Sequence, residues 1–158
     1  MSRFSTLLVA GLVFTQLGLS AQTVKAADEV VVVVKNESSF VINRLKLYLD
    51  TSVVDSSRKN LRAGQTNHVD WDAGNEQNEG ELSFDYAIVG GPQSETCSEK
   101  IQTTGGSPAG QLKEVQLSDG RVYNLDSNVD EVITVRYKVT GAKESSKCSL
   151  DEVRQRLR

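Results

Sequence analysis

The sequence predicts an all-β protein, an antiparallel β-sandwich of about seven or eight strands with a short C-terminal helix and one disulfide. Two observations predict this class. Apolar and polar residues alternate over most of the chain, and an Asp-Gly pair separates two such runs. A period of two puts successive side chains on opposite faces of a strand, so each run has one buried face and one wet face.

The first predicted strand is residues 30–34, five consecutive valines. This β-branched run is too short for a helix and carries no polar residue, which is typical of a strand buried on both faces. A polar break follows at residues 36–39, and Asn36 begins an Asn-Glu-Ser glycosylation sequon there. Three further strands are recognised by their alternating apolar residues: Leu45, Leu47 and Leu49; Val69 and Trp71; and Leu82, Phe84, Tyr86 and Ile88.

A hairpin is predicted in the second half of the chain. Val115 and Leu117 lead into Asp119-Gly120, and residues 122–125 form the return strand. Glycine adopts the positive φ of a tight hairpin turn without steric cost, so Asp-Gly between two alternating runs signals such a turn. A last amphipathic strand is marked by its apolar residues, Ile133, Val135, Tyr137 and Val139.

Two segments depart from this alternation. Residues 90–110 are rich in Gly, Ser and Thr and contain both prolines, which predicts a long connecting loop, and loops of this length are often functional or disordered. Residues 149–158 predict the C-terminal helix, because Ser149 and Glu152 have capping-box spacing. The apolar residues Leu150, Val153 and Leu157 fall on one face of that helix.

The N-terminal residues 1–26 read as a secretory signal peptide. Arg3 precedes an apolar run at residues 7–19, and residues 24–26 supply a Val-Lys-Ala cleavage site. The run is shorter than the roughly 20 residues of a membrane-spanning helix. Residues 27–158 then form a single domain that is exported to the periplasm or the extracellular space.

An exported chain with two cysteines most simply forms one disulfide, here between Cys97 and Cys148. The bridge closes a long loop, which in the chain-entropy model stabilises the fold by roughly 4 kcal/mol. The single histidine, His68, and the two cysteines do not supply the four ligands of a zinc site built from His and Cys alone. No cofactor is predicted.

The charge balance excludes a nucleic-acid partner. The whole chain has a net charge of −3, and residues 1–26 hold two of its basic side chains and none of its acidic ones. Phosphate backbones require a dense face of Lys and Arg, which an acidic domain lacks.

Candidate contact residues lie in two segments. The acidic stretch contributes Asp70, Asp72, Glu76 and Glu79, and the loop near Cys97 contributes Ser94, Glu95 and Lys100. A calcium loop would use Asp70, Asp72 and Glu81 at its first, third and twelfth positions. Gly74 and Asn75 do not fit that pattern, so an ordinary solvated hairpin loop is the alternative.

An enzyme has few residues to work with in this chain. Every Ser–His or Cys–His scheme must use His68, which is predicted on the solvent face of a strand opposite Val69 and Trp71. No G-x-S-x-G motif occurs. A pair of acids for glycoside hydrolysis is available in sequence, but nothing marks one of them as buried. No catalytic residue is assigned.

The first half of residues 27–158 resembles a known family. The five valines lead through an Asn/Ser-rich turn into Leu45-Lys46-Leu47, and residues 61–66 precede the acidic stretch and a strand beginning at Gly80. This order resembles aegerolysin-type β-sandwich proteins, which implies a sandwich fold and binding to membrane lipids. The aromatic-rich segment of that family is missing from the second half, and no functional residue is carried over.

These observations favour a secreted or periplasmic, non-enzymatic binding module that recognises a protein partner, of the inhibitor, immunity or surface-interaction type. The alternative is an aegerolysin-like protein that binds a membrane surface. A hydrolase and a calcium-binding domain rank below both. The fold class does not decide among them, because sandwiches host all of these functions.

Overall fold

A computed structural model describes residues 27–74 and 78–158. The predicted signal peptide and Glu76 lie outside these described residues. Every regular element in the described ranges is a strand, so the all-β class is confirmed. The same ranges contain no helix long and apolar enough to cross a membrane. The strands are β1 (Glu29–Asn36), β2 (Ile42–Leu49), β3 (Ser52–Ser57), β4 (Thr66–Asp72), β5 (Gly80–Ile88), β6 (Glu95–Thr96), β7 (Ile101–Gly105), β8 (Leu112–Leu117), β9 (Val122–Asn124), β10 (Glu131–Ala142) and β11 (Ser145–Leu157).

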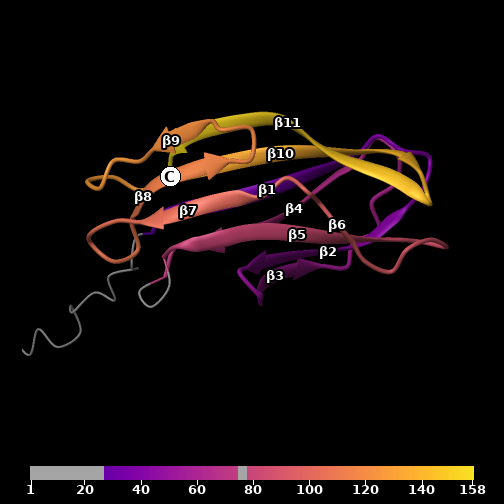
Figure 1. The fold of residues 1–158 in the computed structure, drawn as a ribbon, viewed down its shortest axis with the longest axis horizontal. Coiled ribbons are helices and arrows are strands. Elements are labelled where there is room, and N and C mark those ends of the chain that lie inside the picture. The colour runs from indigo at the N-terminus through magenta and orange to yellow at the C-terminus, as the bar shows by residue number, and fades with distance from the viewer. Residues whose placement is uncertain (1–26, 75–77) are drawn as a thin grey trace, which may run out of the picture.

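The strands form two sheets that run along the length of the molecule (Figure 1). A four-stranded sheet has the order β11-β10-β1-β4, and a seven-stranded sheet has the order β3-β2-β5-β7-β8-β9 with β6 paired to β5. Within residues 27–74 and 78–158 the strand pairs are antiparallel except β1 with β10, which is parallel. The predicted antiparallel arrangement therefore holds apart from this one pair.

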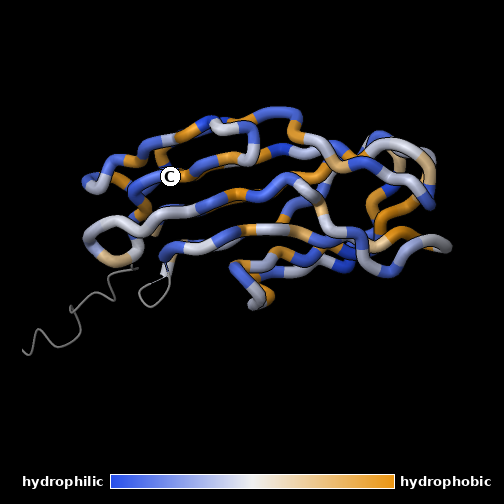
Figure 2. Tube along the Cα trace, viewed as in Figure 1, coloured by the Kyte–Doolittle hydropathy of each residue, from blue (hydrophilic) through white to orange (hydrophobic). Residues whose placement is uncertain are grey.

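The two sheets enclose one core, built by alternating residues along the longer strands (Figure 2). In β1, Val30, Val32 and Val34 are fully buried. Phe84 of β5 packs against Tyr137 of β10 across the core, with ring centroids 5.0 Å apart. Val31 and Val33 point the other way and are half-buried, so the prediction that the valine run is buried on both faces is wrong. The run is apolar on its outer side without being covered there.

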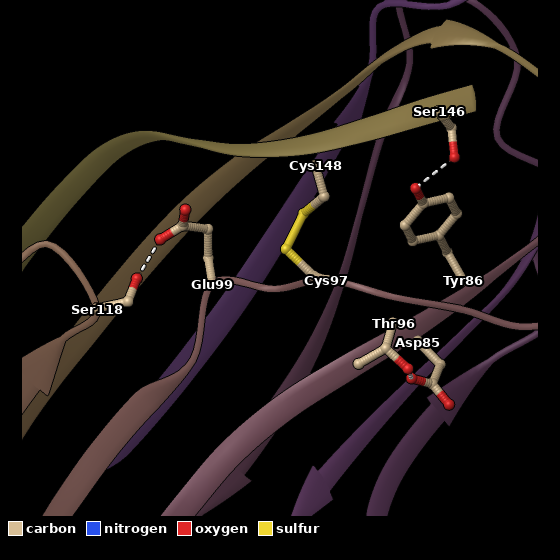
Figure 3. The surroundings of a disulfide bond; sticks show 8 residues. All are labelled: Asp85, Tyr86, Thr96, Cys97, Glu99, Ser118, Ser146 and Cys148. Carbon is tan, nitrogen blue, oxygen red and sulfur yellow. Dashed lines mark hydrogen bonds between the residues drawn. A yellow bond between two sulfur atoms is a disulfide. The ribbon is translucent and has the colours of Figure 1, made fainter.

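Cys97, which directly follows β6, forms the predicted disulfide with Cys148 of β11 (Figure 3). The bond joins the two sheets, because β6 belongs to the seven-stranded sheet and β11 to the four-stranded one. Close by, the hydroxyls of Tyr86 and Ser146 share a hydrogen bond of 2.6 Å between the same two sheets. Disulfides persist in oxidising compartments, which indicates an environment outside the cytoplasm.

A buried carboxylate joins the sheets near the end of β11. Asp28 is fully buried and accepts the backbone N–H of Leu112 at 2.6 Å and that of Glu131 at 2.8 Å. Leu112 begins β8 of the seven-stranded sheet, and Glu131 begins β10 of the four-stranded one. Burial raises the pKa of Asp28 although both N–H bonds act in the opposite direction.

The predicted C-terminal helix over residues 149–158 is wrong, because this segment belongs to β11. The strand pairs with β10 along its whole length, and the pairing contains a bulge. Arg136 faces Glu152 while Tyr137 faces Leu150, which leaves Asp151 as the extra residue. The bulge puts Leu150 and Val153, three residues apart, against the same core. That spacing imitates the apolar stripe of a helix.

The predicted long loop over residues 90–110 is also wrong in part, because it contains β6 and β7. In β7 the inward positions are Ile101 and Thr103, and both are buried. The Thr103 hydroxyl donates to the carbonyl of Gly80 at 3.0 Å, which satisfies it inside the core. A polar residue at an inward position hides the alternation of this strand.

One of the two predicted hairpin turns is present in the structure. The hairpin at Asp119-Gly120 is confirmed between β8 and β9, and Gly120 has a φ of +91°. The acidic stretch after β4 is not a hairpin loop, because it passes from the four-stranded sheet to β5 of the seven-stranded sheet. The side chain of Asn36 is buried and donates to the carbonyls of Phe40 and Leu61, so the folded protein does not present this sequon for glycosylation.

Candidate binding face on the four-stranded sheet

The outward side chains of the four-stranded sheet form a surface that we call the four-stranded face. Strand register sets the side chains in rows that cross β4, β1, β10 and β11 in turn. The two central rows are Asp70–Val31–Thr134–Arg154 and His68–Val33–Arg136–Glu152. Residues opposite each other on neighbouring strands share a face, so each row is a line of neighbouring side chains.

Acidic side chains gather on the β4 side of this face. Glu29 and Asp70 lie near each other, and burial raises the pKa of both carboxyls. Asp55 lies close enough to raise the pKa of Asp70 further, and its Oδ2 accepts the backbone N–H of Asp70 at 2.8 Å. Asp72 forms an ion pair with Arg158, with Nη1 and Oδ1 2.9 Å apart. The acids therefore crowd one another, and Arg158 compensates one end of the group.

Arginines gather on the opposite side, along β10 and β11. Arg154 pairs with Glu152 at 2.8 Å, but both side chains are well exposed, so the pair contributes little to stability. Arg136 and Arg156 form no ion pair within 4.0 Å among the described residues. The β11 side of the face thus presents the positive charges of Arg136 and Arg156, which are not paired with any described acid.

The centre of the face is apolar and hollowed. Val31 and Val33 are half-buried between the two charged sides. A hollow of about 340 Å³ lies over them and is also lined by His68, Asp70 and Arg156. A second hollow of about 160 Å³ adjoins it on the β10–β11 side. Thr134 and Arg156 line both hollows, so the two hollows are neighbours on this face.

The structure divides the sequence-predicted contact residues between the two sheets. Asp70 and Asp72 lie on the four-stranded face. Glu79 accepts a long hydrogen bond from the Gly105 N–H at 3.4 Å in the connection between sheets. The remaining predicted contacts lie on the seven-stranded sheet: Ser94 donates to Asp85, Glu95 is in β6, and Lys100 pairs with Glu81 at 2.9 Å. The acidic stretch and the loop near Cys97 therefore do not form one site.

The structure separates the three acids of the predicted calcium loop. Asp70 and Asp72 are on β4, whereas Glu81 is on β5 in the other sheet and pairs with Lys100. Among the described residues no group of three or more His, Cys, Asp or Glu side chains is arranged to hold a metal ion. His68 is exposed on the four-stranded face as predicted, across from Val33.

Sequence reasoning missed the arginine side of this face. The signal was present, because Arg154, Arg156 and Arg158 alternate with the period of a strand. Because residues 149–158 are predicted as a helix, these arginines are not among the predicted contact residues. No family model, curated protein or solved structure matches the chain.

Proposed function

We propose that this protein is a non-enzymatic binding module of an oxidising, extracytoplasmic compartment, and that it recognises a protein partner through the four-stranded face. One observation carries the proposal. A half-buried valine pair lies between a crowded group of carboxyls and two arginines, Arg136 and Arg156, that form no ion pair with any described residue. This places an apolar centre and two charges of opposite sign on one surface.

The chemistry of the face fits a protein better than a small molecule. Protein interfaces combine an apolar centre with a polar rim, and arginine is enriched among the residues that dominate their binding energy. Separated positive and negative sides also fix the orientation of a partner, since a reversed partner would bring like charges together. We therefore expect the partner to present acids over Arg136 and Arg156 and a basic group over Asp70.

The compartment assignment rests on the Cys97–Cys148 bond and on the leader-like residues 1–26. A non-enzymatic role is supported by what the two reactive residue types do in the fold. Both cysteines are consumed in the disulfide, and His68 is exposed on a strand. A partner that meets the protein outside the cytoplasm is the consistent reading.

The test is quantitative affinity capture from the extracellular or periplasmic fraction of the native source. Three oxidised baits are compared: wild type, Arg136→Glu with Arg156→Glu, and a matched control with Arg58→Glu and Lys113→Glu, which are exposed and lie off the face, Lys113 on β8 of the seven-stranded sheet. We expect at least one protein that wild type and control retain and the face variant loses, because charge reversal opposes the partner's acids. Equal capture by all three baits would overturn the proposal.

The same baits are mixed with neutral, anionic and sterol-containing vesicles to separate protein binding from lipid binding. Sedimentation of the wild type with one vesicle class, together with no face-dependent protein capture, would replace this proposal with the membrane-binding alternative. Trp71 and Phe84 are buried in the core, so neither ring is available for contact with a bilayer. We therefore expect no sedimentation.

A further inference from the structure

The outer surface of the seven-stranded sheet contains a pocket unrelated to the four-stranded face. Its volume is about 370 Å³, within the range of small-molecule sites. It lies where β2, β5 and the end of β3 meet the segment after β5. The side chains that matter to its chemistry are Arg44, Lys46, Arg58, Asn60, Ala87 and Gln93. We call this the β2–β5 pocket.

The hollow exists because a small residue stands opposite a large one. Arg44 and Ala87 are direct partners across the β2–β5 pair, so they share the outer face. Ala87 is only 6% exposed although it points outward, which places it at the floor of the pocket. A larger side chain at this position would occupy the space that the cations surround.

The main cation of the pocket is held in place but not neutralised. The Nη2 of Arg44 donates to the backbone carbonyl of Gln93 at 2.7 Å. Its Nε is buried and has no hydrogen-bond partner among the described residues. A guanidinium has five N–H donors, and a buried donor without a partner is costly, so Arg44 retains unmet capacity for an acceptor.

No acid among the described residues lines the β2–β5 pocket. Asp85 is the acid nearest in register, opposite Lys46. It accepts hydrogen bonds from Ser94 at 3.1 Å and from Thr96 at 2.7 Å, so its oxygens are engaged by hydroxyl groups. Arg44, Lys46 and Arg58 form no ion pair within 4.0 Å in the described part of the chain.

We propose that the β2–β5 pocket binds a small hydroxylated ligand that carries an oxyanion, such as an acidic sugar. The three cations would hold the carboxylate or phosphate group, because charge-assisted hydrogen bonds to guanidinium are the strong ones. The amide side chains of Asn60 and Gln93 both donate and accept, which suits hydroxyl groups. This site is independent of the proposed protein-binding face on the other sheet.

The test is an NMR titration of the uniformly ¹⁵N-labelled, oxidised protein at low ionic strength. The probes are glucuronate, glucose 6-phosphate, inorganic phosphate and uncharged glucose. We expect saturable shifts of the amides around Arg44 and Gln93 with a Kd of about 1 mM or tighter for at least one acidic sugar. Glucose should give no shifts, and the better acidic sugar identifies whether the pocket prefers a carboxylate or a phosphate.

Variants assign the effect to the pocket. Arg44→Gln and, as a second variant at an exposed position, Arg58→Gln should each weaken binding about tenfold, which is the effect of losing a hydrogen bond to a charged group. Ala87→Leu should abolish binding by filling the floor. The matched control, Arg154→Gln, makes the same change in charge on the other sheet and should bind like wild type.

Three results would overturn the proposal. One is the absence of saturable shifts with either acidic sugar. Another is equal weakening by Arg154→Gln and Arg44→Gln, which would show attraction to the net charge alone. The third is binding of inorganic phosphate as tight as that of the acidic sugars, which would remove the role of the amide side chains.

Discussion

The outer surfaces of the two sheets obey the same alternation but differ in what it exposes. On the four-stranded sheet the central outward residues are Val31 and Val33. Acidic side chains lie on the β4 side of them, and arginines lie on the β10–β11 side. On the seven-stranded sheet the small Ala87 leaves a pocket surrounded by cations. The β2–β5 pairing shifts register between Ile42 and Arg44 beside this pocket, whereas β1 pairs regularly with β4 and β10. Local register, together with the size and charge of the outward side chains, therefore distinguishes the compact pocket from the broad face.

The two surfaces are kept in fixed relation by links at two places along β11. Near its start are the Cys97–Cys148 bond and the Tyr86–Ser146 hydrogen bond (Figure 3). Near its end the carboxylate of Asp28 joins β8 and β10, while the Arg158 guanidinium donates to the carbonyl of Ala27 at 2.7 Å. The comparison of the two faces is therefore sharpened by cutting each link separately.

Of these links, removal of the disulfide should lower the free energy of unfolding most. We expect Cys97→Ala with Cys148→Ala to lower the free energy of unfolding by about 4 kcal/mol, because the bridge closes a loop of 51 residues. Urea unfolding of the oxidised wild type and the double variant measures this. A loss below about 1 kcal/mol would show that the Tyr86–Ser146 contact and the core already hold the sheets together.

Replacing the buried carboxylate should have the next largest effect. In Asp28→Asn one acceptor oxygen becomes an NH₂ group that faces a backbone N–H, so we expect a loss of about 2 kcal/mol. The exposed Glu144→Gln serves as the control and should be neutral. Thermal unfolding at neutral pH compares the two, and equal stability of both variants would contradict the structural role of Asp28.

Neutralising one acid of the four-stranded face should have the smallest effect on stability and a specific pH dependence. Burial and the nearby Asp55 raise the pKa of Asp70 above its usual 3.8, so the folded state binds this proton more tightly than the unfolded chain. The contribution of Asp70 to stability is thus present below pH 3.8 and is lost as the pH rises through the raised pKa. We expect Asp70→Asn to match or slightly exceed wild-type stability at pH 7.

Urea unfolding at pH 7 and at pH 3 checks this dependence, with the relative stability of Asp70→Asn falling at the lower pH. If the variant is instead less stable than wild type by more than about 1 kcal/mol at pH 7, the carboxylate is paired favourably and the crowding on the β4 side is not a cost to the fold.

Much of the fold was predictable from the sequence because most strands follow a strict period of two. The runs around Leu45, Leu82 and Ile133 became β2, β5 and β10, and the Asp-Gly turn lies where the pattern predicts it. Strand order was not predictable, because the parallel pairing of β1 with β10 joins segments about a hundred residues apart.

The failures have local physical causes. In β7 a threonine occupies an inward position, and its hydroxyl is satisfied by the carbonyl of Gly80. In β11 the bulge at Asp151 changes the apolar spacing from two to three between Leu150 and Val153, which resembles a helix. Both candidate surfaces depend on strand order. Arg136 and Asp70 share one face because β1 lies between β10 and β4, and Arg44 lies opposite Ala87 because β2 pairs with β5.

The central claim is that the four-stranded face, and not the surface as a whole, recognises a protein partner. The direct test is the Kd of the captured partner for wild type, for Arg136→Glu and for Arg44→Glu, which reverse the same charge on the two opposite faces. We predict that Arg136→Glu weakens binding at least about tenfold while Arg44→Glu leaves the Kd within about twofold of wild type. Equal losses in the two variants, or a loss only in Arg44→Glu, would contradict the account.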